Sequence, residues 1–68
     1  MKLVHNEENK SVVITLNGQV LTVRAFAGDS EITGWNCDYE AEGFGPNYAA
    51  DAYEYEIKRY ERIGYTKL

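Results

Sequence analysis

Apolar and polar residues alternate through the first third of the chain in the manner of β-strands. Two runs rich in β-branched residues, 11–16 and 19–26, enclose the dipeptide Asn17-Gly18. Asn-Gly is a strong hairpin signal because a type I′ turn needs positive φ at both central residues. We therefore predict a two-residue loop with Leu16 opposite Gln19. The residues expected on the core face of this hairpin are Val12, Ile14, Leu16, Leu21, Val23 and Ala25.

Two further strands flank the hairpin. Residues 2–5 are typical of a short strand that precedes it. Strict alternation from Trp35 onward predicts another strand over 31–42, with a bend or bulge at Gly34. We expect Trp35 in the core, where a single large aromatic side chain of so short a chain usually lies.

One helix follows the strands. Residues 48–63 carry an apolar residue at nearly every third or fourth position, between an expected N-cap at Asn47 and a terminating Gly64. The expected apolar stripe consists of Ala49, Ala52, Tyr53, Ile57, Tyr60 and Ile63. The sequence thus predicts a single α+β domain over residues 1–68, a small antiparallel β-meander of three to four strands with one C-terminal helix packed on it.

Charge is distributed unevenly along the chain. The net charge is −4, and residues 25–57 contain eight Asp and Glu but no Lys or Arg. A negative net charge disfavours generic binding to nucleic acid or to anionic membranes. No apolar run approaches the roughly 20 residues that span a bilayer. Cys37 is the only cysteine, so no intramolecular disulfide is possible and we expect a cytoplasmic protein.

No residue pattern indicates catalysis or a dedicated metal site. The only histidine, His5, lies in a predicted strand, and a domain of this size offers little volume for a substrate pocket. Asp38, Glu40 and Glu42 imitate the start of a calcium-binding loop, but the twelfth position, which should be a bidentate Glu, is Ala49. We therefore expect no enzyme activity, no metal and no cofactor.

The acidic middle segment is the main candidate for a binding surface. Alternate residues of a strand lie roughly 6.5–7 Å apart on one face, so Asp38, Glu40 and Glu42 would form a row of carboxylates. Such a row could imitate a nucleic-acid backbone, although solubility and protection of an edge strand explain acidic residues equally well. The expected partner-binding residues are Asp29, Glu31, Asp38, Glu40, Glu42, Phe44 and Tyr48.

These features predict a small acidic protein-binding modulator. The short, cysteine-poor, acidic and tyrosine-rich composition is similar to that of small phage or mobile-element proteins that inhibit a host nucleic-acid-handling protein, of the anti-CRISPR, anti-restriction or polymerase-inhibitor type. The expected partner is a protein with a basic groove, in the host cytoplasm if a phage encodes the chain. Neither membrane binding nor direct nucleic-acid binding is expected, and the chain should be a monomer or a weak homodimer.

Two alternatives stay open. The chain could be a structural or assembly protein, dimerising through the outer sheet face that carries Val13 and Val20. It could also be a small nucleic-acid binder that uses a basic and aromatic patch at the end of the helix, formed by Tyr55, Arg59, Arg62 and Lys67. The helix macrodipole, which favours cations near a C-terminus, gives these basic residues a simpler explanation.

Overall fold

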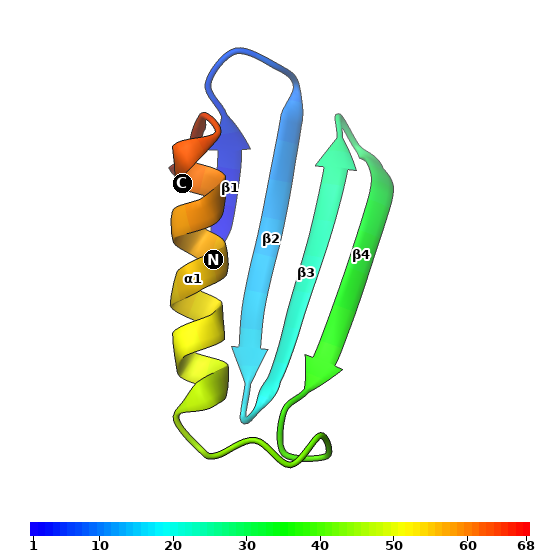
Figure 1. Cartoon of the computed structure of the whole chain (residues 1–68). Helices are drawn as coiled ribbons and strands as arrows, with labels where there is room; N and C mark the ends of the chain where they lie inside the picture. The colour runs from blue at the N-terminus through cyan, green and yellow to red at the C-terminus, as the bar shows by residue number, and fades with distance from the viewer.

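The computed structural model describes residues 1–68, which form a five-stranded sheet and one helix. The elements are β1 (Lys2–His5), β2 (Lys10–Asn17), β3 (Val20–Ala27), β4 (Ser30–Asp38), α1 (Tyr48–Arg62) and β5 (Tyr65–Lys67). Every strand pair is antiparallel, and the order across the sheet is β4-β3-β2-β1-β5 (Figure 1). The predicted α+β fold is confirmed. The short strand β5 lies outside the predicted elements and pairs with β1.

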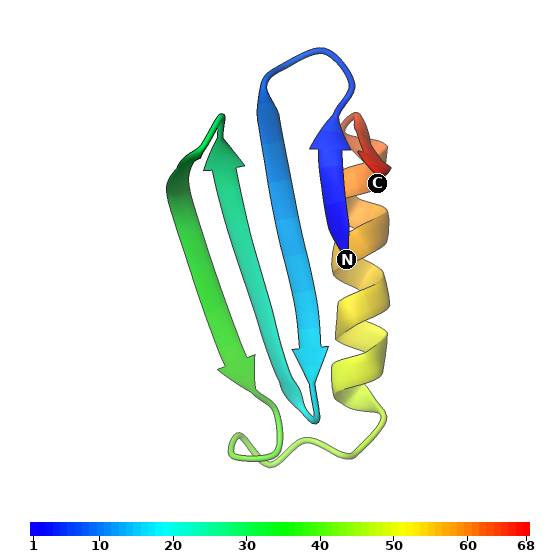
Figure 2. The ribbon, with the colours of Figure 1, turned by 180° about the vertical axis from the view of Figure 1, so that it is seen from behind.

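The core lies between α1 and one face of the sheet. Its buried side chains are Leu3, Val12, Ile14, Leu21, Val23 and Ile57. A helix about 10–12 Å across covers only two or three strands spaced about 4.8 Å apart. Helix α1 accordingly lies over the β1–β2 side, and β4 has no helix across it (Figures 1 and 2). Trp35, on β4, is therefore 41% exposed, and the prediction that it lies in the core is wrong.

The β2–β3 hairpin has the predicted core face but a different register. Leu16 pairs with Leu21 instead of Gln19, and Asn17 pairs with Val20. The two-residue loop is thus Gly18-Gln19, with positive φ at Gly18 alone, as in a type II′ turn. The partner of each β2 residue moves by two positions relative to the prediction. A shift of two positions leaves each side chain on the same face of the sheet, so the residues predicted for the core face still lie on it.

Gly18 makes the hairpin testable. Its φ is +62°, and a Cβ atom there would meet no other atom within 4 Å, so the cost of a side chain is backbone strain alone. We expect Gly18→Val to lower the free energy of unfolding by about 1–3 kcal/mol in urea denaturation. Gly45, which has open space around it and no positive φ, is the matched control. Equal effects of Gly18→Val and Gly45→Val would contradict the turn.

Strand β4 is shorter and differently bent than predicted. It ends at Asp38 and not at residue 42. Its bulge lies opposite Ala25 and Phe26, where Ile32 is the extra residue, two positions before the predicted Gly34. Glu40 and Glu42 are consequently not strand residues, and the expected row of three carboxylates on one strand face does not exist.

The helix agrees closely with the prediction except at its ends. It runs from Tyr48 to Arg62, and the side chain of Asn47, at the N-cap, makes no capping hydrogen bond. Ala49 and Ile57 of the expected stripe are buried, but Ile63 follows the last helical turn and is 57% exposed. Gly64 ends the helix with φ +102°, as predicted.

His5 joins the end of the helix to the sheet. Its Nδ1 accepts hydrogen bonds from the amides of Glu7 and Glu8, both at 3.1 Å. Nε2 lies 3.2 Å from the carbonyl oxygen of Ile63 and therefore carries the proton in the neutral tautomer. The ring also packs edge-on against Tyr65 at 4.9 Å. The only histidine thus has a structural role, which its position in the sequence did not reveal.

Candidate functional site

A single tight turn follows β4 and brings acidic and aromatic side chains together. The amide of Phe44 donates to the Tyr39 carbonyl at 2.9 Å, and that of Gly43 donates to the Glu40 carbonyl at 3.1 Å. With Gly43 at φ +85°, this is the hydrogen-bond pattern of a Schellman motif. Asp38 supports the turn, since its Oδ1 accepts from the amide of Ala41 at 3.2 Å. These local hydrogen bonds replace the predicted strand extension.

Three aromatic rings pack together where this turn meets the helix. Phe44 stacks on Tyr48 with ring centroids 4.3 Å apart and an interplanar angle of 19°. Tyr39 contacts both, at 5.5 Å from Phe44 and 5.2 Å from Tyr48. Phe44 is 45% exposed and Tyr48 48% exposed, whereas Tyr39 is half-buried against the core. Tyr39 thus anchors two stacked rings that face solvent.

The turn that carries Tyr39 and Phe44 also carries three carboxylates, which have no neutralising partners. Asp38, Glu40 and Glu42 are all exposed, and none of them lies within 4 Å of a Lys, Arg or His nitrogen. The surface made by these three carboxylates and the three rings is called here the acidic–aromatic corner; its residues are Asp38, Tyr39, Glu40, Glu42, Phe44 and Tyr48. In Figures 1 and 2 the corner lies on the connection between β4 and α1, at the end of the molecule opposite the β3–β4 turn.

A hollow of about 480 Å³ opens beside the corner. Tyr39 and Tyr48 line it together with four residues of the helix, Asp51, Ala52, Tyr55 and Glu56. Burial raises the pKa of Tyr39 above its ordinary value, and the neighbouring Cys37, Tyr48 and Glu56 raise it further. The Tyr39 hydroxyl therefore stays protonated at neutral pH.

The structure separates the other two predicted partner-binding residues from the corner. Asp29 lies in the β3–β4 turn, roughly 30 Å along β4 from Asp38 at about 3.3 Å per residue. Glu31 forms a bidentate ion pair with Arg24, with two N–O distances of 2.9 Å. Both oxygens of Glu31 are thus occupied by Arg24, whose hydrogen bonds also lower the pKa of the carboxyl, so Glu31 is less available to a partner. The predicted residues thus form one cluster and two outlying positions.

The basic end of the helix is partly occupied by its own neighbours. Arg59 forms an ion pair with Glu56 at 2.9 Å, and its guanidinium lies 4.9 Å from the ring centre of Tyr60. The hydrogen bond to Glu56 raises the pKa of Arg59. An arginine held in this way is less available for a phosphate, which weakens the nucleic-acid alternative.

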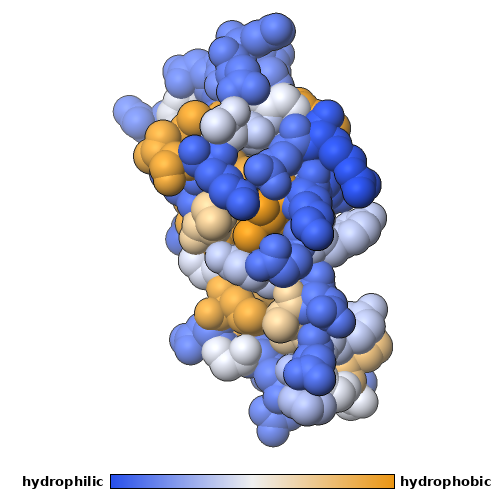
Figure 3. Space-filling model, turned by 90° about the vertical axis from the view of Figure 1, so that its left-hand side faces the viewer, coloured by the Kyte–Doolittle hydropathy of each residue, from blue (hydrophilic) through white to orange (hydrophobic).

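The side of the molecule on which α1 lies is largely polar (Figure 3). Figure 3 shows the side on which α1 lies, where hydrophilic side chains separate small apolar patches. No group of three or more His, Cys, Asp and Glu side chains is arranged to hold a metal ion. The one helix is neither long nor apolar enough to cross a membrane.

Comparison with protein-family models, curated proteins and solved structures finds no match for this chain.

Proposed function

We propose that the chain is a protein-binding module whose acidic–aromatic corner contacts a basic surface of a partner protein. The observation that supports this proposal best is the stacked, solvent-facing pair Phe44 and Tyr48 among three carboxylates that have no cationic partner. Exposed aromatic rings are enriched at interface centres, and unpaired carboxylates around them supply electrostatic complementarity.

The chemistry of the corner favours arginine and lysine as the side chains it contacts. A guanidinium can lie over the face of Tyr48 or Phe44 and simultaneously donate to Glu40 or Glu42. Such contacts suit a groove that normally holds phosphates, since the same basic side chains line it. We therefore propose that the module inhibits a nucleic-acid-handling protein by occupying its basic groove, as a phage or mobile-element inhibitor would.

Competition tests this proposal. The immobilised chain is used to isolate its partner from nuclease-treated lysate of the source cells, and duplex DNA or RNA is then added to the purified complex. We expect nucleic acid to displace the module, because both would occupy one groove. Neutral dextran at the same concentration is the control and should displace nothing. A stable ternary complex of partner, nucleic acid and module would contradict the proposal.

A further inference from the structure

The two edges of the sheet are protected very differently. The edge strand β5 has only three residues and ends in Lys67. Both its shortness and its terminal charge disfavour pairing with another chain. The opposite edge strand, β4, has nine residues and no neighbour on its outer side. Its stretch 32–37 contains no charged residue, and the bulge at Ile32 is the one feature of this stretch that disfavours pairing.

The outer side of β4 offers unpaired backbone groups at regular intervals. The amide of Tyr39 donates to the Gln19 carbonyl at 3.0 Å, which fixes the alternation of hydrogen-bonded pairs between β3 and β4. In an antiparallel pair every second residue bonds to the partner, so Cys37 and Trp35 point their amides toward β3. Gly34 and Asn36 therefore direct their backbone N–H and C=O groups outward.

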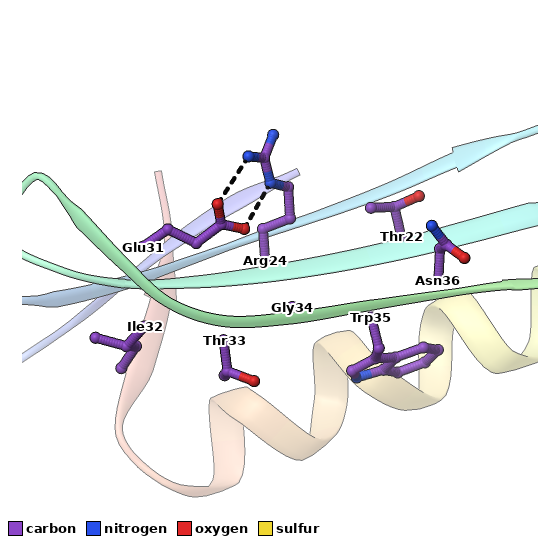
Figure 4. A pocket seen from close by; sticks show the side chains of 8 residues that line it. All are labelled: Thr22, Arg24, Glu31, Ile32, Thr33, Gly34, Trp35 and Asn36. Carbon is purple, nitrogen blue, oxygen red and sulfur yellow. Dashed lines mark hydrogen bonds and ion pairs between the residues drawn. The ribbon is translucent and has the colours of Figure 1, made fainter.

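A shallow hollow of about 410 Å³ lies along this stretch of β4. Figure 4 shows the Arg24–Glu31 ion pair on one face of the strand and the side chains of Thr33 and Trp35 on the other. Gly34 lies between them, and the space where its side chain would be is covered by Glu31 and Arg24, so an approaching chain can reach its backbone only from the edge. Trp35 is 41% exposed because α1 does not reach it.

The charge pattern of β4 decides what would pair with it. Asp29 lies at one end of the uncharged stretch, and Asp38 and Glu40 lie at the other, whereas the charge of Glu31 is already paired with Arg24. A second copy of β4 would carry carboxylates at both of its own ends, so self-pairing in either direction would bring like charges together. Like charges on neighbouring strands destabilise the pair. A strand with an uncharged middle and Lys or Arg at both ends has the complementary pattern.

We propose that β4 binds an extended basic segment of a partner protein as a sixth strand, through the outward backbone groups of Gly34 and Asn36. Main-chain hydrogen bonds supply the affinity in this mode, and alternate side chains supply the specificity. One face of the added strand would lie beside Trp35, and its terminal cations would lie beside the acids at the two ends of β4. The inference depends on the proposed function only for the positive charge of the partner.

A synthetic peptide tests strand addition on the intact protein. The probe is a nine-residue peptide with blocked ends, two lysines at each end and alternating valine and threonine between them. We expect it to change the fluorescence of Trp35, the only tryptophan, and to slow hydrogen exchange at the amides of Gly34 and Asn36. The amide of Trp35, already bonded to β3, is the internal reference. A peptide with glutamates in place of lysines should bind at least about tenfold more weakly.

Two changes isolate the backbone contribution. Asn36→Pro removes one outward N–H group and keeps the pairing with β3, because proline is tolerated on the open side of an edge strand. We expect binding of the lysine peptide to weaken at least about tenfold, whereas Asn36→Thr should change it less than about threefold. If Asn36→Pro does not fold, the unaltered protein can be tested with the lysine peptide methylated at its valine and threonine amides. Methylation removes the N–H groups that would bond to β4, so this peptide should bind about tenfold more weakly than the lysine peptide.

Three results would overturn the proposal. The first is equal binding of the lysine peptide and its methylated form, which would mean attraction by charge alone and would leave the proposed function intact. The second is no binding at millimolar peptide. The third is slow exchange of Gly34 and Asn36 without peptide in a protein that sediments as a dimer, since a second copy would then occupy the edge.

Discussion

Replacing Ile57 by alanine is expected to remove about 2–5 kcal/mol of folding free energy, the usual cost of emptying a well-packed aliphatic site. Ile57 is 3% exposed and is the residue through which α1 joins the core cluster. A domain of this length has about 3–10 kcal/mol of stability at 0.05–0.15 kcal/mol per residue. The variant should therefore lose a large fraction of its stability, about half at the middle of both ranges, which urea denaturation followed by circular dichroism would measure.

Ile63 provides the matched control for this change. Both isoleucines belong to the apolar stripe that the sequence predicts, but Ile63 is 57% exposed beyond the last turn of the helix. We expect Ile63→Ala to change the free energy of unfolding by less than about 0.5 kcal/mol. Comparable losses for the two variants would show that the helix is packed on the sheet differently.

The sequence predicted the sheet and the helix because both are governed by hydrophobic periodicity. The hairpin residues Ile14 and Val23 share the predicted core face even though the turn is displaced, because a displacement of two positions leaves the faces unchanged. Gly64 ended the helix as expected, since a left-handed residue is needed there and glycine adopts that conformation without a Cβ clash.

The early end of β4 was not predicted, because it depends on competition between local and long-range hydrogen bonds. Alternation through Tyr39 and Ala41 is typical of a strand, yet the Asp38 side chain and the left-handed Gly43 stabilise a turn over the same residues. Gly43 followed by an aromatic residue is the signal that could have indicated this motif, because a Schellman turn brings that residue back onto the ring four positions before Gly43.

The exposure of Trp35 depends on which strands the helix covers, and periodicity carries no information about that.

The second large effect concerns the acidic–aromatic corner. Changing Asp38 to Asn and both Glu40 and Glu42 to Gln should leave the fold intact, since the side-chain oxygen of Asn can still accept from the Ala41 amide. Removing three carboxylates from the contact surface should slow association with the partner by about tenfold or more at physiological salt. The difference should shrink as salt is added, because screening weakens the attraction in the parent protein.

A second triple variant separates local charge from net charge. Glu7, Glu8 and Glu61 lie at the opposite end of the molecule, in the β1–β2 loop and the last turns of α1 (Figure 1). Neutralising all three as Gln changes the net charge by the same amount as the corner variant. Under the proposed function it should alter the association rate by less than about threefold.

The binding role of the acidic–aromatic corner is tested most directly by the association rate constant of the isolated partner with the parent protein and the two triple variants, measured by stopped flow at several salt concentrations. We expect the association rate constant to fall about tenfold or more for the corner variant alone, and the three rate constants to converge at high salt. Equal rates for the corner variant and the parent, or equal losses for the two variants, would contradict the claim that the acidic–aromatic corner binds the partner.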